Sequence, residues 1–222
     1  MNRKTVLVAC LVATPFLSGA PTYAQDGDNS RATGGWNYGV ILGVAEWPDL
    51  SEVNSVAGGS FDARGFALEL SAHKPMWHWG SADVLLGVDL GIITTDGNIP
   101  GVFEELTQRS AYLTPSVKFR FGEYGRRYIN LEAGIGYYQT DFAELECDVD
   151  GSICFELNDP FNADAAGGYL GLTVGLGRWF TTGLKVHFAD FGSVNNIRGV
   201  SGDLGGPIYA LSVGAAFGGK KL

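Results

Sequence analysis

Residues 127–138 alternate between apolar and polar positions along their whole length. The apolar positions are Ile129, Leu131, Ala133, Ile135 and Tyr137, and the positions between them are Asn130, Glu132, Gly134, Gly136 and Tyr138. Because successive side chains of a β-strand point to opposite sides, this pattern predicts a strand with one apolar and one polar face. Its length of about ten residues matches a tilted strand that crosses a bilayer.

Comparable segments recur along the chain, so the sequence predicts eight strands. The expected strands are residues 36–45, 61–73, 82–95, 109–121, 127–138, 168–180, 184–191 and 207–217. Long loops are expected at 46–60, 96–107, 141–167 and 192–206, and short turns at 74–80, 122–125 and 181–183. This alternation of long and short connections is typical of transmembrane β-barrels. Pro115 lacks the N–H that a ladder needs, which predicts a bulge in its strand.

The composition of the second face indicates which side of the sheet points outward. It is rich in small residues: Gly39, Gly43, Gly65, Gly87, Gly91, Gly134, Gly136, Gly171, Gly175, Gly177, Ser212 and Gly214. A water-exposed face would carry many Lys and Glu, whereas small residues suit the narrow interior of an eight-stranded barrel. The sequence therefore predicts an all-β fold, an eight-stranded antiparallel up-and-down transmembrane β-barrel whose apolar face meets lipid.

Aromatic residues gather near both ends of the expected strands. Those near the short turns are Trp77, Trp79, Tyr124, Tyr128, Trp179, Phe180 and Phe217, and those near the long loops are Trp47, Phe61, Tyr112, Tyr137, Phe188 and Tyr209. Such rings are enriched where a barrel wall meets the two membrane interfaces. The distribution therefore predicts two aromatic bands.

The N-terminal residues have the features of a secretory signal. Arg3 and Lys4 precede an apolar stretch at 6–17, and small residues up to Ala24 suit cleavage after that position. The expected organisation is a signal peptide at 1–24, a periplasmic N-terminal leader at 25–35, a barrel at 36–217 and a C-terminal tail at 218–222.

Cleavage would remove Cys10 and leave Cys147 and Cys154 in an exported chain. An even pair of cysteines in an oxidising compartment predicts a disulfide that closes a short loop. A metal site would need further thiolate or imidazole ligands, and no histidine is close to the pair in sequence. We therefore expect a disulfide and no bound metal or cofactor.

Two C-terminal segments resemble those of a known family. Residues 185–193, Lys-Val-His-Phe-Ala-Asp-Phe-Gly-Ser, contain an aromatic-x-Asp-Phe-Gly pattern, and residues 209–217 form an amphipathic strand that ends in Phe217. Both are similar to the OmpA/OmpX-like superfamily of small outer-membrane β-barrels, often called porin-family proteins. The resemblance implies location in the outer membrane of a Gram-negative bacterium and insertion by the barrel-assembly machinery. Residues 218–222 depart from it by following the aromatic that usually ends such chains.

Several ionisable residues fall on the predicted inward face. They are Glu69, His73, Asp89, Lys118, Arg120, Glu132, Lys185 and His187. Three carboxylates then face three firm cations, and charges in a narrow lumen must be paired because desolvation costs several kcal/mol per ion. This balance predicts a salt-bridged core that plugs the barrel. The alternative is a narrow ion path along these residues, since the missing side chains of glycine could leave a thread of water.

The remaining candidate interaction sites lie in or next to the predicted loops. Residues 141–165 contain eight acidic residues and no basic one, and the spacing of Asp148, Asp150 and Glu156 does not match a calcium loop. We expect a solvated acidic loop, with divalent-cation binding beside lipopolysaccharide as the alternative. Arg64, near the outer end of its strand, is expected to extend toward the interface or to pair with lipopolysaccharide phosphates.

The overall charge and the motifs narrow the function. A net charge of −9 without a basic stripe argues against nucleic-acid binding. The best elements for a catalytic triad are His187, Asp190 and Ser193, but His187 is expected to face inward while a lipid substrate would lie outside. We therefore expect a monomeric, non-enzymatic barrel with a structural or surface-interaction role in contact with outer-membrane lipids and lipopolysaccharide. A narrow porin-like channel is the main alternative, and a lipid A-modifying enzyme is a distant one.

Overall fold

The computed structural model describes residues 35–48, 60–98, 104–124, 126–147, 154–156, 161–177, 179–197 and 200–218. The predicted signal peptide, nearly all of the leader and residues 219–222 lie outside these ranges and stay predictions. The described part contains strands and turns, and none of its residues forms a helix long and apolar enough to cross a membrane.

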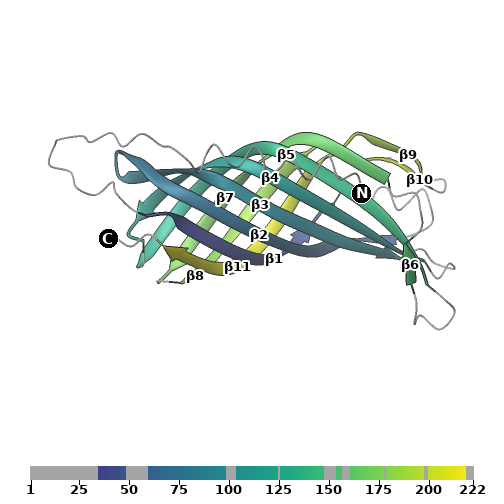
Figure 1. Cartoon of the computed structure of the whole chain (residues 1–222), viewed down its shortest axis with the longest axis horizontal. Helices are drawn as coiled ribbons and strands as arrows, with labels where there is room; N and C mark the ends of the chain where they lie inside the picture. Colours follow the sequence, from purple (N-terminus) through teal and green to yellow (C-terminus); the bar gives the residue numbers. More distant parts are fainter. Residues whose placement is uncertain are drawn as a thin grey trace. The chain divides into compact units, whose positions relative to one another are not determined.

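Eight antiparallel strands of the described chain close into a barrel (Figure 1). They are β1 (Asn37–Glu46), β2 (Ser60–Trp79), β3 (Ala82–Asn98), β4 (Glu104–Gly122), β5 (Arg127–Cys147), β7 (Phe161–Leu176), β8 (Phe180–Ala189) and β11 (Pro207–Gly218). Each strand pairs with its neighbour in the sequence of these eight, and β1 pairs with β11 to close the ring. The predicted fold class is therefore confirmed.

Three short strands lie outside the ring. β6 (Cys154–Glu156) pairs with the end of β5, and β9 (Ser193–Ile197) pairs with β10 (Val200–Asp203). All three belong to connections at one end of the barrel, which we call the long-connection end. The β2–β3, β4–β5 and β7–β8 turns lie at the other end, the short-turn end.

Several strands extend further than the apolar pattern predicted. The loops expected at 96–107 and 141–167 are largely wrong, because β3 and β4 still pair at Asn98 and Glu105, and β5 and β7 pair at Phe142 and Phe161. No apolar residue remains at 96–98, whereas 142–147 and 161–165 still alternate, and the backbone ladder continues through all of these segments. Strand pairing needs only backbone N–H and C=O groups, so the hydrophobic pattern does not show how far a strand extends.

Two local predictions were also wrong. The turn expected at 181–183 lies instead around Gly177, which has a φ of 81°, while Gly183 pairs within the wall with Thr173 and Ser212. No bulge occurs at Pro115: pairing between β4 and β5 is interrupted there but resumes in the same register. The missing N–H removes a ladder bond without inserting a residue. A bulge is found between Pro75 and Trp77.

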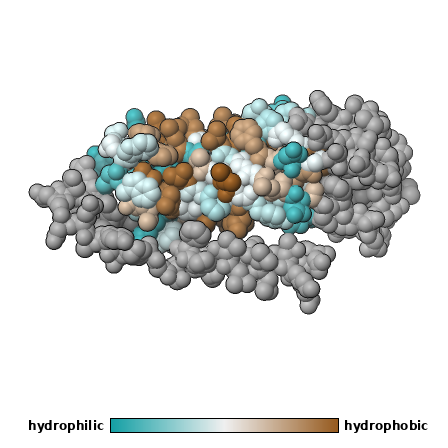
Figure 2. All heavy atoms as spheres, turned by 90° about the horizontal axis from the view of Figure 1, so that it is seen from above, coloured by the Kyte–Doolittle hydropathy of each residue, from teal (hydrophilic) through white to brown (hydrophobic). Residues whose placement is uncertain are grey.

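The outer surface of the wall is apolar. Large side chains such as Val44, Ile135 and Leu211 are 60%, 79% and 64% exposed, and the brown patch in Figure 2 shows apolar residues gathered over the middle of the barrel. Most aromatics of the predicted bands are also exposed. Trp47, Tyr112 and Tyr128 are exceptions, because all three are buried. They lie at inward positions of the strand alternation, whereas the prediction of the bands considered only how near each residue is to a strand end.

Candidate functional site: the barrel interior

Five charged residues meet in the middle of the barrel, and we call them the central network: Glu69, Asp89, Lys118, Glu132 and Lys185. All are at least nine-tenths buried. The strand register aligns three of them, because Lys118 pairs with Glu132 across β4–β5, Glu132 with Gly171, and Gly171 with Lys185. Residues in one row of a barrel point to the same side, so these side chains converge.

The two lysines of the network are shared among its three carboxylates. Lys185 Nζ lies 2.6 Å from Glu69 Oε1 and 3.3 Å from Glu132 Oε2. Lys118 Nζ lies 3.2 Å from Glu132 Oε2 and 3.6 Å from Asp89 Oδ1. Each lysine thus bridges two acids, which lets a buried cluster with an excess of carboxylates persist.

Tyrosine hydroxyls supply further donors to the carboxylates. Tyr112 OH donates to Glu69 Oε2 over 2.7 Å, and Tyr169 OH donates to Asp89 Oδ2. Tyr112 and Tyr169 also pack around His187, whose Nδ1 is 3.0 Å from Tyr138 OH. These aromatic rings form a layer next to the central network on the side of the long-connection end.

The inward glycines make room for these rings. A Cβ added to Gly91 would lie 2.3 Å from Tyr112 OH, and one on Gly134 would lie 2.4 Å from Tyr169 Cε1. In both cases the tyrosine is the cross-strand partner of the glycine, and its ring lies over the glycine Cα. At these two positions the space beside the glycine is filled by a protein ring and not by water.

Arg120 behaves differently from the two lysines. Its guanidinium is buried, yet among the described side chains no carboxylate lies within ion-pairing distance of it. Its Nε donates to Asn130 Oδ1 at 3.2 Å and one terminal nitrogen donates to Asn37 Oδ1 at 3.3 Å. The sequence analysis counted Arg120 among three cations that face three carboxylates, whereas in the structure the two lysines serve all three carboxylates.

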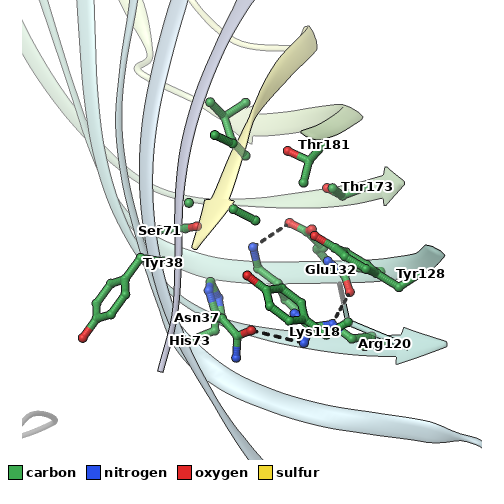
Figure 3. Close-up of a pocket in the computed structure, with 16 residues that line it drawn as sticks. Asn37, Tyr38, Ser71, His73, Lys118, Arg120, Tyr128, Glu132, Thr173 and Thr181 are labelled. Atoms are coloured by element: carbon green, nitrogen blue, oxygen red, sulfur yellow. Dashed lines mark hydrogen bonds and ion pairs between the residues drawn. The ribbon is translucent and has the colours of Figure 1, made fainter. Parts of the chain in front are cut away.

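Two tyrosine rings that stack on each other lie close to the same guanidinium. Arg120 Cζ lies 4.7 Å from the centroid of Tyr124 and 4.8 Å from that of Tyr128, within the range of cation–π attraction. Arg120 and its partners lie nearer the short-turn end than the central network, beside a cavity of about 40 Å³ (Figure 3).

The structure brings together a Ser–His–Asp set that the sequence analysis missed. His73 Nε2 lies 2.7 Å from Ser116 Oγ and 3.7 Å from Asp89 Oδ2. The register could have revealed the contact, because His73, Gly87 and Ser116 occupy one row across β2, β3 and β4. Both partners approach the same ring nitrogen, whereas a catalytic triad uses opposite nitrogens. This geometry favours a structural role.

The triad considered from the sequence does not assemble among the described side chains. His187 is buried against Tyr138, while Asp190 is exposed and accepts a hydrogen bond from the N–H of Gly192. No hydrogen bond or ion pair joins His187 to Asp190 in the part of the chain that the structure describes. The side chain of Ser193 lies outside it.

Apolar residues close the interior at the long-connection end, and we call them the mouth cluster: Ala45, Trp47, Ile93, Phe191, Leu204 and Ile208. Trp47 packs on Phe191 with ring centroids 5.8 Å apart, and its Nε1 donates to Gly205 O at 3.0 Å. Backbone hydrogen bonds between the β8 exit and Leu204 hold the cluster across the opening. A polar group of Thr95, Gln108, Ser110 and Thr140 joins side chains of β3, β4 and β5 near this end.

Three further sequence predictions concern this end. The antiparallel register pairs Cys147 with Cys154 across β5 and β6, and such partners have Cα atoms about 4.5–5.5 Å apart, within the range of disulfides. The disulfide itself stays a prediction. Most of the acidic stretch at 141–165 lies outside the residues whose side chains are described. Arg64 is exposed and its cross-strand partner is Glu46.

Comparisons with known proteins add similar folds at low identity. No family model matches the sequence, and no curated protein matches it. Among solved structures, Ail of Yersinia pestis, in complex with the heparin analogue sucrose octasulfate, is 14% identical with a TM-score of 0.46, covering 82% of this chain and 99% of Ail. The outer-membrane protein OprG of Pseudomonas aeruginosa is 12% identical with a TM-score of 0.46, covering 83% and 96%.

Neisserial surface protein A is a third similar structure, at 13% identity and a TM-score of 0.40, covering 82% of this chain and 96% of its own. Likeness at this level carries no argument about function. The strand pairing, the apolar exterior and the buried charged interior are this chain's own properties. On those grounds the protein is an eight-stranded antiparallel β-barrel of the architecture found in small outer-membrane proteins.

Proposed function

We propose that this protein is a non-enzymatic outer-membrane barrel that serves as a closed anchor for its long connections. The observation that carries the proposal is the double closure of the interior. The central network fills the middle of the barrel, and the mouth cluster fills the long-connection end. A filled interior leaves the outer connections as the surfaces available for interaction.

Location in the outer membrane is supported by the exterior and by the predicted signal peptide. An apolar belt such as that of Val44, Ile135 and Leu211 would be unfavourable in water but matches the lipid-facing band of a barrel. Exposed rings at Trp79 and Trp179 lie near the short turns, where an interface is expected. The orientation that follows has short turns in the periplasm and long connections outside.

Surface interaction is the role that this orientation favours. The stretch at 141–165 is strongly acidic, and a Cys147–Cys154 disulfide would restrain part of it. The proposed surroundings are outer-membrane lipids and lipopolysaccharide, with insertion by the barrel-assembly machinery and a monomeric state. Divalent cations between the acidic stretch and lipopolysaccharide phosphates belong to the same proposal.

A narrow channel is the second candidate, and one observation favours it. The 40 Å³ cavity beside Arg120 reaches Lys118 and Glu132, so small solutes could enter the interior from the short-turn end. To conduct, they would have to pass the central network, the tyrosine layer and the mouth cluster.

Single-channel recording on the refolded protein in a planar bilayer separates the two candidates. We expect no conductance steps from a barrel whose folding is shown by heat-modifiable migration on a gel. Steps whose size changes in Arg120→Gln or Glu132→Gln would overturn the closed-anchor proposal and establish a water path along these residues. Absence of conductance in the parent protein and in both variants, each shown to be folded, supports the closed-anchor proposal.

A further inference from the structure

Arg120 is a buried cation with no carboxylate within 4.0 Å among the described side chains, although Asp83 and Glu132 lie in its wider surroundings. Arg120 is 5% exposed, and the two amide oxygens that it contacts carry no formal charge. Its cross-strand partner Asp83 is instead 2.5 Å from His78 Nδ1. Leaving a buried ion without a counter-charge is costly, so the surroundings of Arg120 should show how it is compensated.

The cavity next to Arg120 has several hydrogen-bond donors in a lining that also contains apolar residues such as Ile41 and Ala215. Hydroxyl and amide groups of Asn37, Ser71, Asn130 and Thr181 line it together with Lys118 and Arg120. Figure 3 shows Asn37, Lys118 and Arg120 on one side of this space and Thr181 on the other. Glu132 is the carboxylate of the lining, and its Oε2 is already 3.2 Å from Lys118 Nζ and 3.3 Å from Lys185 Nζ. The lining thus carries two cations and one carboxylate, and that carboxylate is paired with the lysines and not with Arg120.

We propose that this cavity is a binding site for one small monovalent anion of about the size of chloride, held by Arg120. One water needs about 10–15 Å³ of such space, so a cavity of about 40 Å³ accepts a small anion with little accompanying water. The stacked rings of Tyr124 and Tyr128 contact the guanidinium, and together with the hydrogen bonds to Asn37 and Asn130 they restrict its orientation. The site goes beyond the proposed function, because a closed anchor has no need of an anion.

The test uses the folded full-length mature barrel in detergent micelles and measures the broadening of the chloride NMR line. Sodium chloride is titrated against sodium gluconate at constant ionic strength, so that screening stays unchanged and only a small anion is varied. We expect saturable broadening in the parent protein. Arg120→Gln should weaken it at least about tenfold, since hydrogen bonds to a charged group are lost.

Two variants make the result specific. Arg126→Gln removes an exposed arginine of the short-turn end that pairs with Glu123 at 3.1 Å, and should leave the broadening unchanged. Thr181→Val replaces a hydroxyl of the opposite cavity wall by a methyl group and leaves Arg120 in place, so it still tests the site if Arg120→Gln fails to fold. It should weaken binding in a barrel that folds normally. Equal broadening in the parent, Arg120→Gln and Thr181→Val, or no saturable broadening in the folded parent, would overturn the proposal.

Discussion

The middle of the barrel and its long-connection mouth are both built from inward-facing positions, but they are filled by opposite chemistry. In the middle, Glu69, Glu132 and Lys185 are held by ion pairs at 2.6 and 3.3 Å. At the mouth, Trp47 and Leu204 are fully buried in apolar contact. The difference shows that alternation along a strand decides which side a residue faces, while the neighbours available on that side decide how the space is stabilised.

The largest expected effect comes from breaking the central network at Lys185. Lys185→Met keeps most of the side-chain volume but removes the cation that bridges Glu69 and Glu132. Because it leaves buried carboxylates without a partner, the free energy of unfolding should fall by about 3–5 kcal/mol. Urea unfolding in lipid vesicles, followed by tryptophan fluorescence, measures the change.

The double variant Glu69→Leu/Lys185→Met is the control for that experiment. It removes one acid with its cation, so much of the lost stability should return. A double variant that is less stable than Lys185→Met alone would show that the network does not stabilise the barrel through this pair.

The mouth should respond through cavity formation instead of charge. Leu204→Ala leaves a void beside Trp47 and Phe191 and should lower the free energy of unfolding by about 2–5 kcal/mol. The loss should be near ~2 kcal/mol if the surrounding residues move in to fill the void. The matched substitution Leu211→Ala changes a lipid-facing side chain that is 64% exposed, where lipid can fill the space. Equal losses at both positions would contradict a packed mouth cluster.

The smallest effect should come from adding a methyl group between two charged side chains of the central network. A Cβ on Gly171 would lie 3.0 Å from Lys185 Cγ and 3.5 Å from Glu132 Cβ, so Gly171→Ala should cost about 1–2 kcal/mol. In a Lys185→Ala background the Cγ is absent and the cost of Gly171→Ala should nearly disappear, which a double-mutant cycle of unfolding measures. An unchanged cost would locate the strain elsewhere.

The sequence analysis predicted the inward positions and missed the partners. Glu132 and Lys118 could be placed inside from their strands alone, because alternation is local. That Lys185 reaches two acids, and that Arg120 reaches none among the described residues, depends on register across four strands and on Gly171 lying between two of them. Register is a long-range property, so periodicity within one strand does not contain it.

The same division explains the errors. Tyr112 was assigned to a membrane interface because it lies near a strand end. Its place in the strand alternation instead points the ring inward, where it lies over Gly91. The strand extension to Asn98 was missed because backbone pairing continues after the apolar pattern ends, whereas the extension to Cys147 was missed although Ala143, Leu145 and Cys147 still alternate with Glu144 and Glu146.

Composition and alternation by themselves determined an all-β chain of about eight amphipathic strands, an apolar outer face and an inward set of charges and glycines, because each follows from side chains two residues apart. Only the tertiary structure decided that tyrosines fill the spaces beside Gly91 and Gly134, that two lysines serve three carboxylates, that Arg120 faces a cavity and that Trp47 and Leu204 are buried at the mouth. These depend on which residues of different strands meet in the closed barrel, and closure sets the registers of all eight strands together.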